Sequence, residues 1–217
     1  MASTGGFGSS LWARLGGVAA MALAVAGCAA PATTQQTARY DIVHDQAGFT
    51  IIEEARIGSD LRYEYDAALA LLEQQQYRRG IAGLVGVTGR APHVTAPWID
   101  LGIAYGRTGD LQRAADSLEK ALALNPDHPV ALNEIGMIYR KTGRFAQARQ
   151  SYERALAVHP GFHFARRNLA ILCDLYLGDL DCALENYERY RLAVPDDDEP
   201  VMWIADLRNR ANRQSSR

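Results

Sequence analysis

The sequence predicts an all-α protein, an α-α superhelical solenoid of about four two-helix repeats with a C-terminal capping helix. The first observation is a ladder of prolines, Pro92, Pro126, Pro160 and Pro195, at intervals of 34, 34 and 35 residues. A fixed period of this length indicates a stack of similar units. The second is that the residues between the prolines repeat at the same offsets: Trp98, Leu101, Gly102, Tyr105, Gly109, Ala114, Leu118 and Ala121 correspond to Leu132, Ile135, Gly136, Tyr139, Gly143, Ala148, Tyr152 and Ala155.

The third observation is the helical spacing inside each unit. In residues 95–128, Trp98, Leu101, Ala104 and Tyr105 lie three or four positions apart, as on one face of a helix. A Gly-Asp break follows, and a second apolar series begins at Leu111. Each unit therefore predicts two helices joined by a short turn.

These residues resemble the tetratricopeptide repeat. Residues 95–128 fill all eight signature positions compatibly, and residues 129–162 match nearly as well, with Leu132 in place of the tryptophan. Residues 163–197 resemble a further repeat with one residue inserted near 175–178, and residues 49–94 hold an N-terminal segment and a divergent repeat starting near Leu61. Residues 198–212 predict the capping helix that a solenoid needs to cover its last apolar face. Within the N-terminal segment, residues 49–52 fit either a short strand or the start of a helix.

The first 27 residues predict an export signal. Arg14 is the only charge before an apolar run at 15–26, which is too short for the roughly 20 residues that span a bilayer. Val25-Ala26-Gly27-Cys28 resembles the bacterial lipoprotein box, which implies lipidation at Cys28. The alternative is an ordinary signal peptide with Cys28 incidental. In the lipoprotein family, Ala29 after the cysteine implies sorting to the outer membrane.

Residues 28–48 predict a polar tether, because residues 31–37 are small and polar. The two other cysteines, Cys173 and Cys182, fall on neighbouring segments of one predicted helical hairpin. In an exported protein an even pair predicts a disulfide. The alternative is two separately buried thiols.

Composition and motifs exclude several classes of function. The net charge is −2 and aromatic residues make up 8%, which argues against nucleic-acid binding. The sequence has no HExxH pair, and the glycine run at 80–89 lacks the Lys-Ser/Thr ending of a phosphate loop. We therefore expect no enzyme activity, cofactor, metal or small-molecule substrate.

The resemblance implies a concave groove lined by the first helices, in which a protein partner or peptide segment binds. Position by position, it assigns to the groove Arg62, Tyr65, Leu69, Ile99, Ile103, Arg107, Asn133, Met137, Arg140, Lys141, Phe164, Arg167, Asn168 and Ile171. Acidic neighbours also occur, at Asp66, Asp100 and Glu134. The alternative is that several of these residues only solvate an exposed face.

The combined expectation is a lipid-anchored, non-catalytic adaptor on the periplasmic face of the outer membrane. It would assist assembly of a pilus, a secretion system or another envelope complex. Two alternatives remain: an accessory factor of peptidoglycan-active enzymes, and a permanent structural subunit of an envelope machine.

Overall fold

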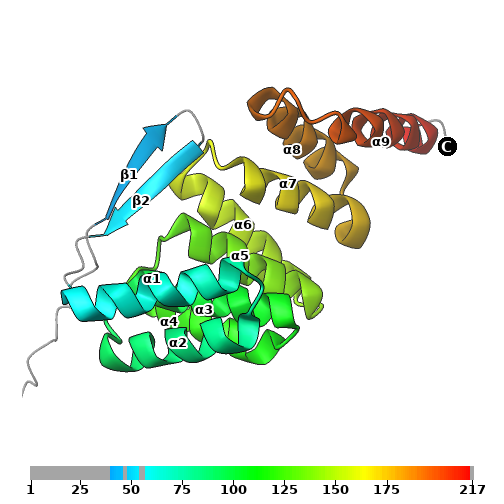
Figure 1. The fold of residues 1–217 in the computed structure, drawn as a ribbon. Coiled ribbons are helices and arrows are strands. Elements are labelled where there is room, and N and C mark those ends of the chain that lie inside the picture. The colour runs from blue at the N-terminus through cyan, green and yellow to red at the C-terminus, as the bar shows by residue number, and fades with distance from the viewer. Residues whose placement is uncertain (1–39, 46–47, 54–56, 216–217) are drawn as a thin grey trace, which may run out of the picture. The chain divides into compact units, whose positions relative to one another are not determined.

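The computed structural model describes residues 40–45, 48–53 and 57–215, within one compact unit of residues 36–217. The predicted export signal and Cys28 lie outside the described residues. The described elements begin with two strands, β1 (Tyr40–Asp45) and β2 (Gly48–Glu53). They continue with α1 (Ser59–Glu73), α2 (Tyr77–Arg90), α3 (Thr95–Thr108), α4 (Leu111–Leu124), α5 (Pro129–Lys141) and α6 (Phe145–Val158). The last are α7 (His163–Leu172), the π-helix η1 (Cys173–Leu177), α8 (Leu180–Ala193) and α9 (Glu199–Ser215) (Figure 1).

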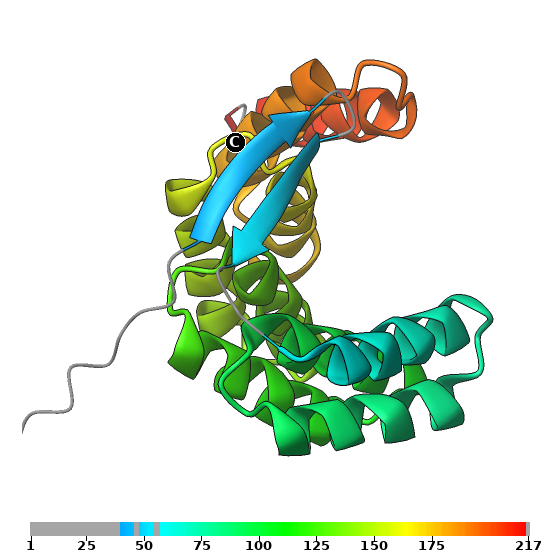
Figure 2. The ribbon, with the colours of Figure 1, turned by 60° about the vertical axis from the view of Figure 1, so that its left-hand side comes forward.

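The helices stack as successive pairs, which confirms the predicted all-α superhelical fold (Figure 2). Helices α1 and α2, α3 and α4, α5 and α6, and α7 and α8 form the pairs. Each second helix also contacts the first helix of the next pair, and α8 contacts α9. The first helices α1, α3, α5 and α7 contact one another in series. They form an inner layer, on which equivalent positions of successive repeats come side by side.

Local sequence sets the ends of these helices. Gly109 and Gly143 take φ values of 84° and 76° after α3 and α5, a left-handed conformation that glycine adopts without a steric cost. The Asp110 carboxylate then caps α4 by accepting a hydrogen bond from the backbone N of Arg113. The divergent repeat has no such glycine, and Gln75 takes the left-handed conformation with φ 59°.

Small residues let the two helices of a pair approach closely. A Cβ atom on Gly102 would lie 2.6 Å from Cγ of Leu118, and one on Gly136 would lie 2.6 Å from Cε1 of Tyr152. Leu118 and Tyr152 are fully buried. The repeated glycine is therefore needed for the packing of each central pair.

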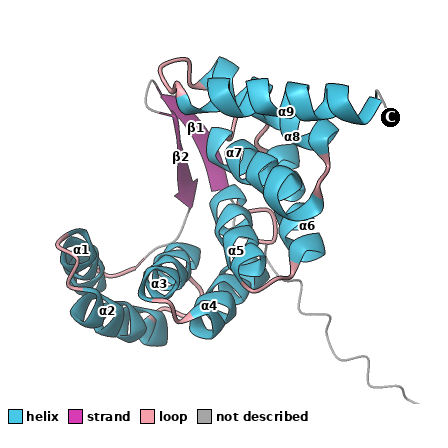
Figure 3. Cartoon of the chain, turned by 90° about the vertical axis from the view of Figure 1, so that its right-hand side faces the viewer, coloured by secondary structure: helices cyan, strands magenta, loops and turns pink. Residues whose placement is uncertain are grey.

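The N-terminal segment forms a hairpin. Strands β1 and β2 pair antiparallel, with Tyr40 opposite Glu53 and His44 opposite Phe49 (Figure 3). They form the one sheet found among the described residues. Of the two alternatives for residues 49–52, the structure has the strand. The predicted tether at 28–48 is wrong for residues 40–45, because β-branched Ile42 and Val43 favour an extended, paired backbone there.

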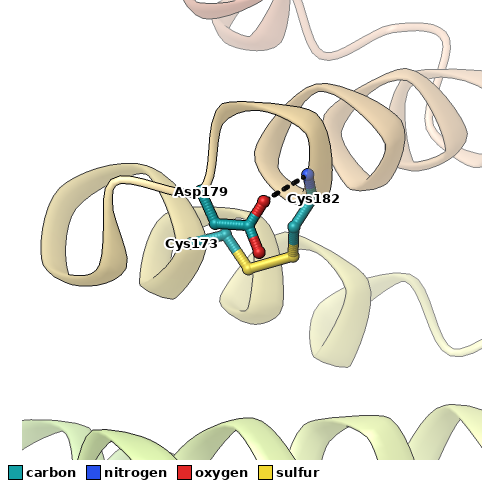
Figure 4. A group of neighbouring side chains, drawn as sticks. All are labelled: Cys173, Asp179 and Cys182. Carbon is teal, nitrogen blue, oxygen red and sulfur yellow. Dashed lines mark hydrogen bonds between the residues drawn. A yellow bond between two sulfur atoms is a disulfide. The ribbon is translucent and has the colours of Figure 1, made fainter.

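The one-residue insertion in the last repeat is accommodated by η1. A π-helix takes up one residue more per turn than an α-helix, which explains the single 35-residue interval. Cys173 at its start and Cys182 in the first turn of α8 form a disulfide with an S–S distance of 2.06 Å (Figure 4). The Asp179 carboxylate accepts a hydrogen bond from the backbone N of Cys182 at 3.1 Å and caps α8. The irregular segment is thus closed by a covalent link and a helix cap.

We expect loss of this disulfide to lower stability without unfolding the chain. Replacing both cysteines, Cys173→Ala and Cys182→Ala, should reduce the free energy of unfolding by about 2–3 kcal/mol, because the closed loop is short. Chemical denaturation measures the change, with the reduced wild type as the matched comparison. An unchanged midpoint in both samples would contradict a stabilising role.

Candidate functional site

A pocket of about 630 Å³ lies on the inner layer, between α3, α5 and α7. Its walls combine apolar side chains with polar and charged ones. They come from β2, α3, the start and body of α5, and the start and body of α7: Ile51, Ala96, Ile99, Asp100, His128, Val130, Asn133, Glu134, Met137, Phe162, His163, Phe164, Arg167 and Asn168. Three consecutive repeats therefore contribute to one site.

The predicted groove residues divide into three sets. The pocket is lined by Ile99, Asn133, Met137, Phe164, Arg167 and Asn168. A smaller neighbouring pocket of about 240 Å³ is lined by Ile103, Arg107, Met137 and Lys141. The others, Arg62, Tyr65, Leu69, Arg140 and Ile171, line neither. The structure thus brings most of the predicted residues of α3, α5 and α7 together at the pockets, and leaves out Arg140, Ile171 and the three residues of α1.

Tyr65 and Arg140, which lie outside the pockets, make a hydrogen bond and a cation–π contact with other side chains. The Tyr65 hydroxyl donates a hydrogen bond to the Asp100 carboxylate, which links α1 to α3. The Arg140 guanidinium lies 5.8 Å from the ring centroid of Tyr176. Both residues therefore act on neighbouring side chains rather than on the pocket space.

Asp100 and Glu134 belong to the pocket, although the groove assignment from sequence left them out. They occupy equivalent positions, 34 residues apart, and Asp66 and Asn168 occupy the same position in the flanking repeats. The position is acidic in three consecutive repeats. This recurrence was a signal in the sequence, but it did not indicate how deeply the carboxylates lie.

Burial raises the pKa of both carboxyls. It raises the pKa of Glu134 to about 7, against the opposing effects of a hydrogen bond from Asn133 and the charges of Arg107 and Lys141. Burial also raises the pKa of Asp100, with the hydrogen bond from Tyr65 acting in the opposite direction. Both carboxylates are therefore poorly solvated, and an added positive charge would stabilise them.

A chain of amide hydrogen bonds fixes the polar wall. Asn168 Nδ2 donates to Asn133 Oδ1 at 2.9 Å, and Asn133 Nδ2 donates to Glu134 Oε1 at 3.1 Å. Asn133 is buried, with 3% of its surface exposed. The bonds join α7 to α5 and hold the Glu134 carboxylate in place.

The pocket's arginine is engaged with the C-terminal helix. An Arg167 guanidinium nitrogen lies 2.9 Å from a Glu199 carboxylate oxygen at the start of α9. The guanidinium also lies 5.5 Å from the ring centroid of Trp203 and 5.9 Å from that of Tyr190. Its charge is therefore balanced by Glu199 and directed toward α9.

The histidines at the pocket are held neutral. Burial lowers the pKa of His128 to about 4 and also lowers the pKa of His163. His128 Nδ1 accepts a hydrogen bond from the backbone N of Ala131 at 3.3 Å, which caps α5. At neutral pH these rings add no positive charge to the site.

In the described part of the chain, a cluster of side chains that could in principle bind a metal ion consists of Cys173, Asp179 and Cys182. Its two sulfur atoms are bonded to each other, and Asp179 caps α8 (Figure 4). The group is therefore explained by the disulfide and the cap.

Within the described residues, none of the helices has the length and apolar character needed to cross a membrane.

Comparison with known proteins identifies the family. The family model described as tetratricopeptide repeat matches residues 65–129, 99–161 and 133–173, which together cover half of the chain. The chain belongs to the tetratricopeptide-repeat family. Repeats of this family generally form non-catalytic scaffolds that bind protein partners in a groove. No curated protein sequence matches the chain.

Solved structures share the fold at low sequence identity. MamA 41-end from Desulfovibrio magneticus RS-1 is 19% identical, covering 74% of this chain and 90% of that one, with a TM-score of 0.65. TTC0263, a thermophilic tetratricopeptide-repeat protein in Thermus thermophilus, is 24% identical, covering 69% and 81%, with a TM-score of 0.58. These similarities support the tetratricopeptide-repeat solenoid as the scaffold of the pocket.

Replacing the buried carboxyl should stabilise the protein in a pH-dependent way. A carboxyl whose pKa is higher in the folded state than in the unfolded state destabilises the fold at high pH, and this cost disappears as pH falls to the unfolded value. We expect Glu134→Gln to raise the free energy of unfolding at pH 8 by about 1–3 kcal/mol, and by much less at pH 5.

Denaturation at both pH values measures this effect. Glu153→Gln is the matched control, because Glu153 is exposed on α6 and pairs with Arg149 there. Its effect should stay within about 0.5 kcal/mol at either pH. An equal gain at pH 5 and pH 8 for Glu134→Gln would show that the charge is not the cause.

Proposed function

We propose that the chain is an adaptor of the bacterial envelope, anchored through lipidated Cys28, and that the pocket between α3, α5 and α7 holds a segment of a partner protein. The observation that carries the binding site is Phe164, a large apolar side chain with 56% of its surface exposed at the pocket wall. It shares that wall with Met137 and Val130 and with the fixed polar amides. Apolar surface with a few placed polar groups is typical of binding sites.

The proposed role is assembly of an envelope complex, such as a pilus or secretion system, on the periplasmic face of the outer membrane. Support for this location comes from the sequence of residues 1–28 alone. The repeat fold supports binding of a protein partner, and no catalytic step is needed for the role.

The binding site can be tested by site-specific photocrosslinking in the native host. We expect a benzoylphenylalanine at position 164 to yield adducts with a discrete partner. Position 192 is the matched control, because Leu192 is also apolar and is 80% exposed, but it lies on α8 and outside the pocket. Equal adducts at both positions, or none at position 164, would place partner binding elsewhere.

Lipidation can be tested independently of the binding site. Wild-type protein should fractionate with the outer membrane and incorporate labelled fatty acid, because the thiol of Cys28 is the proposed acylation site. Cys28→Ala should incorporate no fatty acid and should leave the membrane fraction. Unchanged labelling of the variant would overturn the anchor but not the adaptor role.

A further inference from the structure

The inner layer carries a column of acidic positions. Asp66, Asp100 and Glu134 recur at 34-residue intervals on α1, α3 and α5, and Asn168 follows on α7. Asp100 and Glu134 lie in the wall of the pocket, whereas Asp66 does not. A ligand that crosses the pocket therefore meets two carboxyls in succession.

The hydrogen bonds that these two carboxyls accept come from neutral groups, which do not balance their negative charge. Asp100 accepts from the Tyr65 hydroxyl, and Glu134 accepts from the Asn133 amide. The guanidinium in the pocket wall, Arg167, is balanced by Glu199. The pocket is thus short of positive charge, while its carboxyls are buried enough to have raised pKa values.

The positive groups that act on Glu134 lie in the last turns of α3 and α5. Arg107 of α3 and Lys141 of α5 line the smaller pocket, which shares Glu134 and Met137 with the larger one. Both cations belong to exposed residues. Solvent screens their effect on Glu134, and neither lines the larger pocket with Asp100.

Apolar walls flank the two carboxyls. Ile99 precedes Asp100 on α3, and Met137 lies one turn after Glu134 on α5. Phe164 of α7 adds the exposed ring. Such walls suit the methylene stem of a long cationic side chain and the apolar residues beside it.

We propose that this pocket selects a partner segment in which a lysine or arginine is flanked by apolar residues, with its cationic group between Asp100 and Glu134. This inference rests on the proposed function, since it specifies the chemistry of the segment that the groove binds. Relief of the desolvation of two buried carboxyls supplies the preference for a cation.

Fluorescein-labelled peptides of the sequence Gly-Ser-Leu-Lys-Leu-Ser-Gly, and versions with Gln or Glu in place of Lys, provide the probes. Fluorescence anisotropy with the wild-type protein at pH 8 should show binding of the lysine peptide at least about tenfold tighter than of the glutamine peptide, with the glutamate peptide weakest. Asp100→Asn combined with Glu134→Gln should remove the difference between lysine and glutamine peptides.

The matched control combines Asp116→Asn with Glu185→Gln. It removes the same two negative charges from exposed positions on α4 and α8. This control should keep the full preference for lysine. Circular dichroism at the assay temperature confirms that both double variants are folded.

The preference for the lysine peptide should also weaken as the pH is lowered. The charged, titratable and amide groups that interact with Glu134 or line a pocket with it are Asp100 and Arg107 of α3, His128 at the start of α5, Asn133 and Lys141 of α5 itself, Tyr152 of α6, and Arg167 with His163 of α7. Among these groups, the pKa of Glu134 is about 7, whereas burial lowers the pKa of His163. Between pH 8 and pH 6 the lysine peptide should therefore weaken several-fold with wild type, and much less with Glu134→Gln.

The outcomes separate the two proposals. Equal binding of all three peptides, or a preference for lysine that survives the double pocket variant, overturns the charge selection and leaves groove binding intact. Tighter binding of the glutamate peptide overturns it as well. Failure of every peptide to bind overturns this inference, and crosslinking at position 164 then decides independently whether the groove holds a partner.

Discussion

Close approach of the two helices within each central pair is the constraint on which the rest of the structure depends. Gly102 faces Leu118 and Gly136 faces Tyr152, and in each case a Cβ would lie only 2.6 Å from the partner side chain. Ala114 and Ala148 are fully buried in the same pairs. This contact fixes the rotation of each first helix about its axis. The same sequence position therefore faces inward in every repeat, which converts a 34-residue period into columns of side chains on one surface.

The columns on the inner layer differ in composition from the faces that pack within each pair. The positions that face the paired helix must be apolar or small, whereas those that line the pocket vary: Ile99, Asn133 and Arg167 occupy one column, and Asp100, Glu134 and Asn168 the next. Two of these residues are costly, because burial raises the pKa of Glu134 to about 7 and that of Asp100 above its usual range. Carboxyls with perturbed pKa values in a concave site are typical of functional sites.

The sequence predicts the regular part of the fold well, since glycine, alanine and proline recur at positions where only they fit. Its predictive power ends where a contact joins distant elements. The pairing of β1 with β2 escaped it, because Ile42 and Val43 sit in a short segment beside a polar stretch. Asp100 and Glu134 were visible as acidic neighbours, but their burial depends on three packed repeats. The pairing of Arg167 with Glu199 depends on how α9 docks, which no local pattern encodes.

The irregular last repeat helps to set the charge of the pocket. The inserted residue comes after Asn168 and is taken up by η1, so the columns keep their register through α7. The disulfide joins the start of η1 to α8, and α8 packs on α9. Asp174 of η1 pairs with Arg210 of α9, and Glu188 of α8 lies 2.6 Å from Arg208. These links hold α9 where Glu199 reaches Arg167. The only guanidinium in the described pocket wall is thereby neutralised by the capping helix, so in the proposed complex the two carboxyls would be the charges that select the bound segment.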